Sequence, residues 1–192
     1  MRRGAAPAAP CFSVAPMRVI GGRSRGRRLA AKLPASVRPT SDRVRESIFD
    51  ILGSQGGVEG LRVVDLFCGS GAMGLEALSR GAASATFVDR DPEALAAVKA
   101  NLDGVGLGDE PTTLVRASLP LWLGSAPDFD LALCDPPYDF EGWPELLAAL
   151  NTERAVLESS TEISVPEGWV VTRARRYGGT LVTVAQRSNS DS

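Results

Sequence analysis

Histidine is absent from this sequence, and cysteine and lysine are scarce. The lack of histidine excludes Ser-His-Asp and Cys-His catalysis, histidine general bases and histidine metal ligands. The three cysteines, Cys11, Cys68 and Cys134, are too far apart to form a CxxC pair or a zinc set, so no metal is expected. A sparse, odd cysteine count is typical of a reducing compartment, which predicts a cytoplasmic protein. No run of about 18 apolar residues occurs, so no membrane span is expected.

The chain is long enough for one domain with short appendages. Of its 192 residues, 44% are apolar and 23% are charged, an ordinary globular composition. Organised sequence begins at Met17, a candidate for the true start. Residues 1–16 are expected to be a disordered extension, although their arginines and lack of acids leave a transit peptide open. We expect a basic β-hairpin arm over residues 17–39, an α/β domain over residues 40–187 and a disordered tail over residues 188–192.

Positive and negative charges are unevenly distributed, although the formal net charge is only −2. Residues 1–45 carry ten arginines, one lysine and one acid, a net charge of +10, whereas the remaining residues carry −12. A basic segment on an acidic body favours a polyanionic partner bound at one end. A solvated, partly disordered tail is the alternative interpretation, and charge alone does not decide between them.

Strand and helix patterns alternate from residue 61 onward. Strands are predicted at 61–67, 84–89, 112–116, 129–134 and 155–159, with helices at 72–80, 92–102 and 143–150 and a short helix near 118–123. The segments 169–177 and 180–187 flank Gly178-Gly179 and predict a β-hairpin. This order predicts an α/β fold with a mainly parallel sheet, helices on both faces and an antiparallel C-terminal hairpin.

A further helix is predicted over residues 40–52, where Thr40 or Ser41 can act as the N-cap. The apolar residues at helical spacing are expected to face the core, namely Val44, Ile48, Ile51 and Leu52. The polar side chains Arg43, Arg45 and Glu46 are expected on the helix surface.

A glycine-rich segment, GSGAMG (69–74), follows an expected strand and opens an expected helix, and Asp89 ends the next strand, twenty positions after Gly69. Glycine lets the backbone approach a ligand closely, the helix N-terminus attracts negative charge, and a carboxylate at the next strand end can bind a ribose diol. The pattern predicts a nucleoside-containing cofactor. A tight turn that simply needs glycine is the alternative.

Several observations oppose NAD(P) or ATP as that cofactor. Asp65 stands four residues before Gly69, where a carboxylate suits a cationic amino-acid group and is poorly placed beside a pyrophosphate. No histidine can relay a proton, and neither Lys32 nor Lys99 stands four residues after a tyrosine. A Gly-Lys-Ser/Thr phosphate-binding loop is also absent.

The segment Asp135-Pro136-Pro137-Tyr138 directly follows the expected strand 129–134, at the carboxyl edge of the sheet, where ligands bind in such folds. Two prolines stiffen the loop and remove backbone donors, which leaves carbonyls and one carboxylate as acceptors. Acceptors beside an aromatic ring suit a planar base that presents an amino group. A rigid proline turn with a surface tyrosine is the alternative.

Together, VVDLFCGSG (63–71) and DPPY (135–138) resemble S-adenosylmethionine-dependent methyltransferases that act on exocyclic amines of adenine, cytosine or guanine. Three further segments are similar to the bacterial 16S ribosomal RNA guanine-N2 methyltransferase family, the RsmD family: RVIGGRSRGRRL (18–29), RPTSDRVRESIFDIL (38–52) and GSGAMGLEALSRGA (69–82). The resemblance covers residues 17–187 and implies a Rossmann-like methyltransferase fold, S-adenosyl-L-methionine as the cofactor and 16S ribosomal RNA as the substrate.

The same resemblance implies roles for residues at the strand ends. Asp65, Phe67, Gly69 and Gly71 would line the methionine end of the cofactor. Asp89 would hold the ribose hydroxyls, and Ser118 would face the adenine amino group, where such enzymes commonly carry Asp or Asn. Asp135 and the Pro136 carbonyl would bind the target amine, while Tyr138 would stack on the flipped base.

An exocyclic amine needs no cysteine nucleophile, so Cys68 and Cys134 are interpreted as small buried residues at strand ends. The candidate RNA-binding residues are Pro137 and seven arginines: Arg18, Arg23, Arg25, Arg27, Arg28, Arg38 and Arg43. For each arginine, a solvated side chain is the alternative. A monomer is expected, and an assembling small subunit is favoured over naked RNA, although both stay open.

Three competing functions remain at this point. An adenine-N6 or cytosine-N4 DNA methyltransferase would share the DPPY loop, but sequence-specific DNA enzymes usually carry a separate recognition region, and little of the chain is left to form one. A non-catalytic RNA-binding protein would not need the intact Asp135 and glycine loop. An NAD-binding oxidoreductase is disfavoured by Asp65 and by the missing proton relay.

Overall fold

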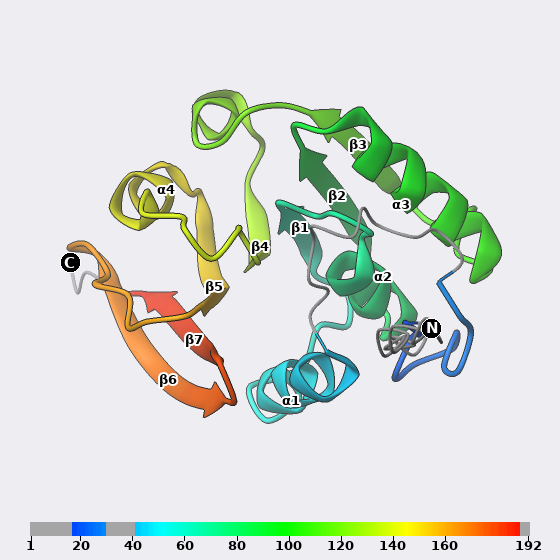
Figure 1. The fold of residues 1–192 in the computed structure, drawn as a ribbon, viewed down its shortest axis with the longest axis horizontal. Helices are drawn as coiled ribbons and strands as arrows, with labels where there is room; N and C mark the ends of the chain where they lie inside the picture. The colour runs from blue at the N-terminus through cyan, green and yellow to red at the C-terminus, as the bar shows by residue number, and fades with distance from the viewer. Residues whose placement is uncertain (1–16, 30–40, 189–192) are drawn as a thin grey trace, which may run out of the picture.

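The computed structural model describes residues 17–29 and 41–188. The expected extension with Cys11, the rest of the arm with the candidate Arg38, Thr40 and residues 189–192 of the expected tail lie outside the described residues. Twelve elements follow in chain order (Figure 1): α1 (Asp42–Gly53), β1 (Arg62–Leu66), α2 (Ala72–Ser79), β2 (Ser84–Asp89), α3 (Pro92–Gly104), β3 (Thr112–Arg116), the 3-10 helix η1 (Leu121–Ser125), β4 (Phe129–Cys134), α4 (Trp143–Ala149), β5 (Thr152–Ser159), β6 (Trp169–Tyr177) and β7 (Thr180–Arg187).

The seven strands form one sheet in the order β3-β2-β1-β4-β5-β7-β6. The first five strands of this order are parallel, whereas β7 pairs antiparallel with both β5 and β6. The predicted fold class is therefore confirmed, including the antiparallel C-terminal hairpin. The short helix expected near residues 118–123 is a 3-10 helix three residues later, and β5 begins at Thr152 rather than residue 155.

Alternation along the strands divides the core between the two faces of the sheet. In β4, Leu131 and Leu133 pack with α1, whereas Ala132 and Cys134 pack with α4. A stretch of strand that is buried on both faces must be apolar, as β4 is from Leu131 to Cys134. Helices α1, α2 and α3 cover one face, and α4 with η1 covers the other. No helix in the described part of the chain is long and apolar enough to cross a membrane.

Local signals set the helix starts. Ser41 caps α1, because its hydroxyl accepts a hydrogen bond from the Val44 amide at 3.3 Å. Asp91 caps α3 in the same way through the Glu93 amide, and Pro92 occupies the first turn, where its missing N–H costs nothing.

Residues 17–29 form a short basic hairpin, here called the arm, which packs against α2 and α3. A single antiparallel bridge joins Arg18 to Arg28, in place of the two extended strands that were expected. Val19 and Leu29 are buried with the apolar side chains of both helices. The arm therefore shares its core with the rest of the fold.

Arg45 corrects a prediction, because its side chain is wholly buried rather than on the helix surface. Its Nη2 donates to the Arg18 carbonyl at 2.6 Å and to Asp42 at 2.8 Å, and its Nε lies 3.8 Å from Glu76. Helical spacing along α1 could not show that the arm, distant in sequence, covers this side. Buried charges are tolerated when they are paired, and these two carboxylates supply the pairing.

Candidate active site

A cavity of about 1190 Å³ opens at the carboxyl ends of β1, β2 and β4. Its lining includes residues of both predicted motifs and the acids beside them, among them Asp65, Gly69, Asp89, Asp135 and Tyr138. These residues come from three segments that are distant in the sequence, and the parallel sheet brings the ends of their strands to one edge. This is the edge at which α/β folds bind ligands.

The turn between β1 and α2 forms the floor of the cavity. Gly71 is the N-cap of α2 with a φ of 76°, a left-handed conformation that glycine adopts without strain. A Cβ at this position would lie 2.9 Å from Val98, so the space is also too tight for a side chain. The chain can pass this close to α3 only because residue 71 is glycine.

Asp65 lies beneath this turn and is 2% exposed. Its Oδ2 accepts a hydrogen bond from the Gly74 amide at 2.9 Å. Burial raises the pKa of Asp65 well above its usual range, the Gly74 amide opposes this shift, and the nearby charges of Asp135 and Asp89 add to it. A buried carboxylate that borders a cavity favours a cationic ligand group there, because such a group would compensate the desolvated charge.

Asp89 ends β2 and orients the glycine turn. Its Oδ2 accepts from the Gly69 amide and its Oδ1 from the Asp91 amide, both at 3.0 Å. The carboxylate is only partly buried and lines the cavity. It therefore holds two loops together while it remains accessible to a ligand.

Phe67 follows β1 with a φ of 58°, a conformation that is unusual for a residue with a side chain. Its ring packs edge-on against Phe140, with the ring centroids 5.2 Å apart, and Phe140 packs in turn against Trp143. This aromatic row joins the glycine turn after β1 to the loop after β4. Such local strain persists where surrounding contacts determine the conformation, and it clusters at functional sites.

The loop after β4 presents its residues at different depths. Asp135 is partly buried, Pro136 is buried, and Pro137 is exposed. Tyr138 is 55% exposed, and its hydroxyl lies 3.1 Å from the Thr180 hydroxyl on β7. The loop thus places a carboxylate within the cavity and an aromatic ring at its mouth.

Both cysteines near the cavity are buried, as expected. Burial raises the pKa of the Cys68 and Cys134 thiols, and the negative charge of Asp65 raises both further. These thiols stay protonated at neutral pH and are poor nucleophiles. Ser118, the expected adenine contact, is exposed on the cavity wall.

None of the candidate arginines that the structure describes lines the cavity, and Arg38 lies outside the described residues. Arg18 forms an ion pair with Asp42 at 3.3 Å, and Arg23 forms one with Glu110 at 2.5 Å. The other three arm arginines and Arg43 are exposed and have no ion pair among the described residues: Arg25, Arg27, Arg28 and Arg43. Two of the candidates are therefore already neutralised within the protein.

Several cavity residues were missed by the sequence analysis, and two of them are polar groups beside the predicted loop after β4 or at the end of β5. Glu158, near the end of β5, is 5% exposed and lines the cavity. Thr180 lines it from the β7 side of the β6–β7 turn. The end position of Glu158 in a predicted strand was a usable signal, whereas the placement of Thr180 depends on how β7 pairs with β5.

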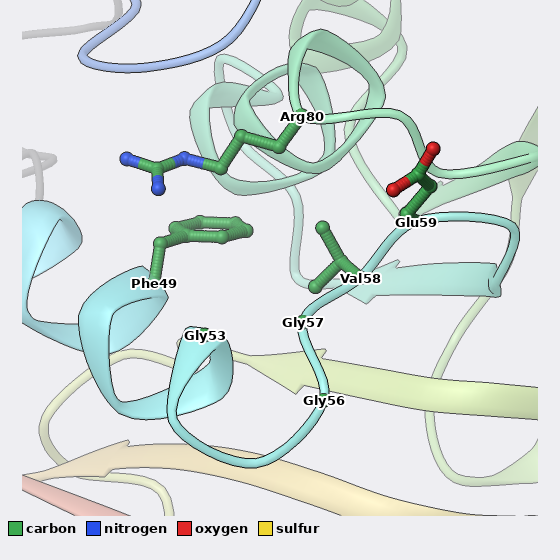
Figure 2. A pocket seen from close by; sticks show the side chains of 7 residues that line it. All are labelled: Phe49, Gly53, Gly56, Gly57, Val58, Glu59 and Arg80. Atoms are coloured by element: carbon green, nitrogen blue, oxygen red, sulfur yellow. The ribbon is translucent and has the colours of Figure 1, made fainter.

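Another missed group, Glu76, lies away from the cavity and anchors the arm. Its fully buried carboxylate accepts from the amides of Ile20 and Gly21, both at 2.7 Å, and pairs with Arg80 at 2.8 Å. Arg80 also lies over the Phe49 ring in a separate pocket of about 210 Å³ (Figure 2). This smaller pocket shares no lining residue with the cavity.

No cluster of potential metal ligands occurs among the residues that the structure describes. Two carboxylates of the cavity, Asp65 and Asp89, accept hydrogen bonds from backbone amides.

Comparison with known proteins places this geometry in a family. The family model described as Conserved hypothetical protein 95 matches residues 17–186. YlbH of Bacillus subtilis (strain 168) is 37% identical over 185 residues, which cover 89% of this chain and 99% of YlbH. The Ribosomal RNA small subunit methyltransferase D of Escherichia coli (strain K12) is 32% identical over 161 residues, with 84% of this chain and 73% of that protein covered.

Solved structures agree with the sequence relatives. The chain is similar to yhhF from Escherichia coli, with a TM-score of 0.77 and 32% identity over 90% of this chain and 98% of that one. A hypothetical protein of Thermus thermophilus gives a TM-score of 0.74 and 34% identity, with 88% and 98% covered. The chain therefore belongs to the family described as Conserved hypothetical protein 95, the RsmD-like family that the sequence motifs predicted.

Proposed function

We propose that this protein is an S-adenosylmethionine-dependent methyltransferase that methylates the exocyclic N2 amine of a guanine in 16S ribosomal RNA, with guanine 966 as the target. One observation carries the proposal: the Asp135-Pro136-Pro137-Tyr138 loop opens onto the same cavity as the glycine turn, Asp65 and Asp89. The names of its relatives, which include a small subunit rRNA methyltransferase, support ribosomal RNA as the substrate.

The cavity residues fit S-adenosylmethionine. Asp65 is a buried carboxylate at the cavity wall, which suits the cationic amino-acid end of this cofactor. Asp89 lies at the end of the neighbouring strand and would accept hydrogen bonds from ribose hydroxyls. Phe67, Gly69 and Ser118 line the cavity and would complete its contacts. Gly71 was expected to line the cofactor too, but it is buried behind the cavity wall and would act only by shaping the turn. When bound, the cofactor supplies an electrophilic methyl group on a sulfonium centre.

The residues after β4 would prepare the amine for transfer. A guanine amine is a poor nucleophile, because its lone pair is delocalised into the ring. The Asp135 carboxylate and the Pro136 carbonyl would accept its two N–H groups and so turn the lone pair toward the methyl group. Asp135 would then take the proton that the methylated amine releases. Most of the rate enhancement would come from positioning.

The exposed ring of Tyr138 would hold the flipped base. Extrusion of a base from its stack costs a few kcal/mol, and stacking on an aromatic side chain returns about 1–3 kcal/mol. The Thr180 hydroxyl, within hydrogen-bond distance of the Tyr138 hydroxyl, would keep the ring at the cavity mouth. Pro137 and the arm arginines would contact the surrounding RNA.

A methyl-transfer assay tests the proposal. Radiolabelled S-adenosylmethionine is offered with unmodified small subunits, 16S RNA or duplex DNA, and the labelled nucleosides are identified. N2-methylguanosine from subunits or 16S RNA is expected, and the preferred substrate separates an assembled particle from naked RNA. N6-methyladenine or N4-methylcytosine in DNA would contradict the RNA assignment. Absence of transfer to every substrate would favour the non-catalytic interpretation.

Substitution of Asp135 tests the mechanism. Asp135→Ala is expected to lower kcat by about 10²–10³-fold or more, as loss of one preorganised polar contact does in other enzymes. Binding of S-adenosylmethionine, measured by calorimetry, should change little. Glu145→Gln, an exposed carboxylate on α4, is the control. Full activity of Asp135→Ala would overturn the assignment.

A further inference from the structure

The last strand in the order of the sheet, β6, is exposed on both faces. Every residue from Val170 to Arg176 is exposed, and within the described part of the chain β6 pairs with β7 alone. Figure 1 shows β6 at the end of the sheet that is opposite to β3 and α3. An edge strand of this length needs a feature that prevents unwanted pairing with other chains.

The β6–β7 hairpin concentrates positive charge in an otherwise acidic body. Residues 169–187 contain four arginines and no acid, whereas residues 46–192 as a whole carry a net charge of −12. Three of these arginines lie on β6: Arg173, Arg175 and Arg176. None of the three forms an ion pair with a described residue. Arg187 is partly buried and donates to the Leu150 carbonyl, which leaves the three exposed arginines of β6 available to bind a polyanion.

The hairpin turn places this charge next to the cavity. Residues 177–180 line the cavity mouth, and Thr180 reaches Tyr138. Directly paired residues of antiparallel strands point to the same face. Arg175 pairs with Val182 and Arg173 with Val184, and both valines pack in the core on the α1 face. Arg175 and Arg173 therefore follow Tyr177 along one face, away from the cavity, in steps of about 7 Å.

The contacts of Arg175 and Arg176 leave part of each guanidinium for a ligand. The Arg175 guanidinium lies over the Tyr177 ring, with its carbon 5.3 Å from the ring centroid. Arg176 donates from Nη1 to the Ser160 carbonyl at 3.1 Å. A guanidinium has five N–H donors in a planar fork that matches phosphate oxygens, so one such contact leaves donors free.

We propose that β6 is a second RNA-binding element, in which Arg173 and Arg175 on one face, with Arg176 on the other, bind backbone phosphates beside the nucleotide whose base enters the cavity. This inference rests on the proposed function and adds residues that the motifs did not indicate. A second copy of the chain is a poorer occupant of this edge, because self-pairing would bring arginines against arginines.

The test compares the double variant Arg173→Gln/Arg175→Gln with Arg62→Gln. Arg62 is exposed at the amino end of β1, at the opposite edge of the sheet from the cavity, and its ion pair among the described residues is with Asp130 at 2.9 Å. Binding to unmodified small subunits is measured over a range of salt concentrations, together with kcat and KM for methyl transfer, the Kd of S-adenosylmethionine and the Tm.

The affinity for RNA falls as salt rises, and each phosphate contact to a single strand contributes about 0.7 to the steepness of log K against log salt. Loss of two contacts should therefore make this dependence shallower by about 1.4. KM for the subunits should rise while kcat and cofactor binding stay unchanged. Arg175→Lys should keep most of the slope, because it keeps the charge. Arg62→Gln should match the wild type.

The remaining outcomes would each contradict the proposal for β6. If the wild type methylates subunits and the double variant keeps its slope and KM, the inference is wrong and the proposed function stands. If the wild type neither binds nor methylates RNA, both are wrong. A concentration-dependent wild-type dimer that the double variant lacks would assign β6 to self-association and overturn the proposal.

Discussion

At the scale of single residues, Asp65 shows how one position serves both the fold and the site. The carboxylate follows two buried valines of β1 and is itself buried, yet it borders the cavity. Its amide partner, Gly74, lies in the first turns of α2. Burial makes the ionised form costly without a ligand, and the same burial strengthens its attraction to a cation.

The raised pKa of Asp65 predicts a pH-dependent stability. The folded protein holds the Asp65 proton more tightly than the unfolded chain, whose carboxyl has an ordinary pKa of about 3.9. The tighter proton binding stabilises the folded protein. This stabilisation is fully present below the unfolded pKa of about 3.9 and is lost as the pH rises through the raised pKa of the folded protein. In the ligand-free protein, Asp65→Asn should therefore gain Tm relative to the wild type as the pH rises.

The same substitution, which should stabilise the ligand-free protein at higher pH, should weaken cofactor binding. A hydrogen bond to a charged group contributes about 1.5–3 kcal/mol, so Asp65→Asn should weaken S-adenosylmethionine binding by about ten- to a hundredfold. Thermal melts at several pH values and calorimetry check the two effects. Asp50→Asn, an exposed carboxylate on α1, is the control. A Tm difference that does not vary with pH would contradict the prediction.

At the scale of elements, the arm is joined to the fold by a buried polar anchor as well as by apolar packing. Glu76 on α2 binds two arm amides, and Ser79 receives the Arg23 amide at its carbonyl. Ser24 donates from its hydroxyl to the Val105 carbonyl after α3. These contacts fix the orientation of the arm, so its basic side chains are displayed on a rigid element.

Gly22 is the residue at which the backbone of the arm passes closest to α2. Its φ is 72°, and a Cβ there would lie 1.9 Å from the Ser79 carbonyl oxygen. Gly22→Ala should displace the arm, lower the Tm and weaken RNA binding. The left-handed conformation alone costs about 1–2 kcal/mol, or roughly 2–8 °C in a domain of this size, and the steric clash adds to it.

Gly26→Ala is the matched control, since Gly26 has a φ of 83° but a Cβ at this position would meet no atom within 4 Å. It should show the conformational cost alone and keep RNA binding. Equal losses of Tm and of RNA affinity in the two variants would contradict the anchoring role of residue 22.

At the scale of the whole molecule, the two basic elements lie toward opposite ends of the sheet. The arm lies beside α2 and α3, β6 lies at the other end, and the cavity opens between them (Figure 1). In the proposed complex, RNA would be held on both sides of the target base, while the acidic remainder of the surface would repel it elsewhere.

The exposed arm arginines should therefore contribute to the salt dependence of RNA binding. Arg25→Gln/Arg28→Gln should make the decrease of log K with log salt shallower by about 1.4 and leave the Tm and cofactor binding unchanged. Arg62→Gln/Lys99→Gln removes the same charge at exposed positions outside the arm. Filter binding at several salt concentrations distinguishes the pairs, and identical slopes would contradict an RNA-binding arm.

Much of the site could be predicted because its motifs are local. The glycine turn and the DPPY loop directly follow strands, and Asp65 and Asp89 lie at or near the last residues of β1 and β2. Parallel strands must present their carboxyl ends at one edge. The alternating pattern of apolar runs and helical spacing likewise determined the fold class, since strand and helix periods differ.

The tertiary structure decided which charges are buried and what surrounds the cavity. Helical spacing alone assigns Arg45 to the surface, and only the packing of the arm onto α2 buries it beside Glu76. Thr180 reaches Tyr138 only because β7 pairs antiparallel with β5. Periodicity assigns a side chain to a face of its own element, whereas the element that covers this face depends on contacts distant in the sequence.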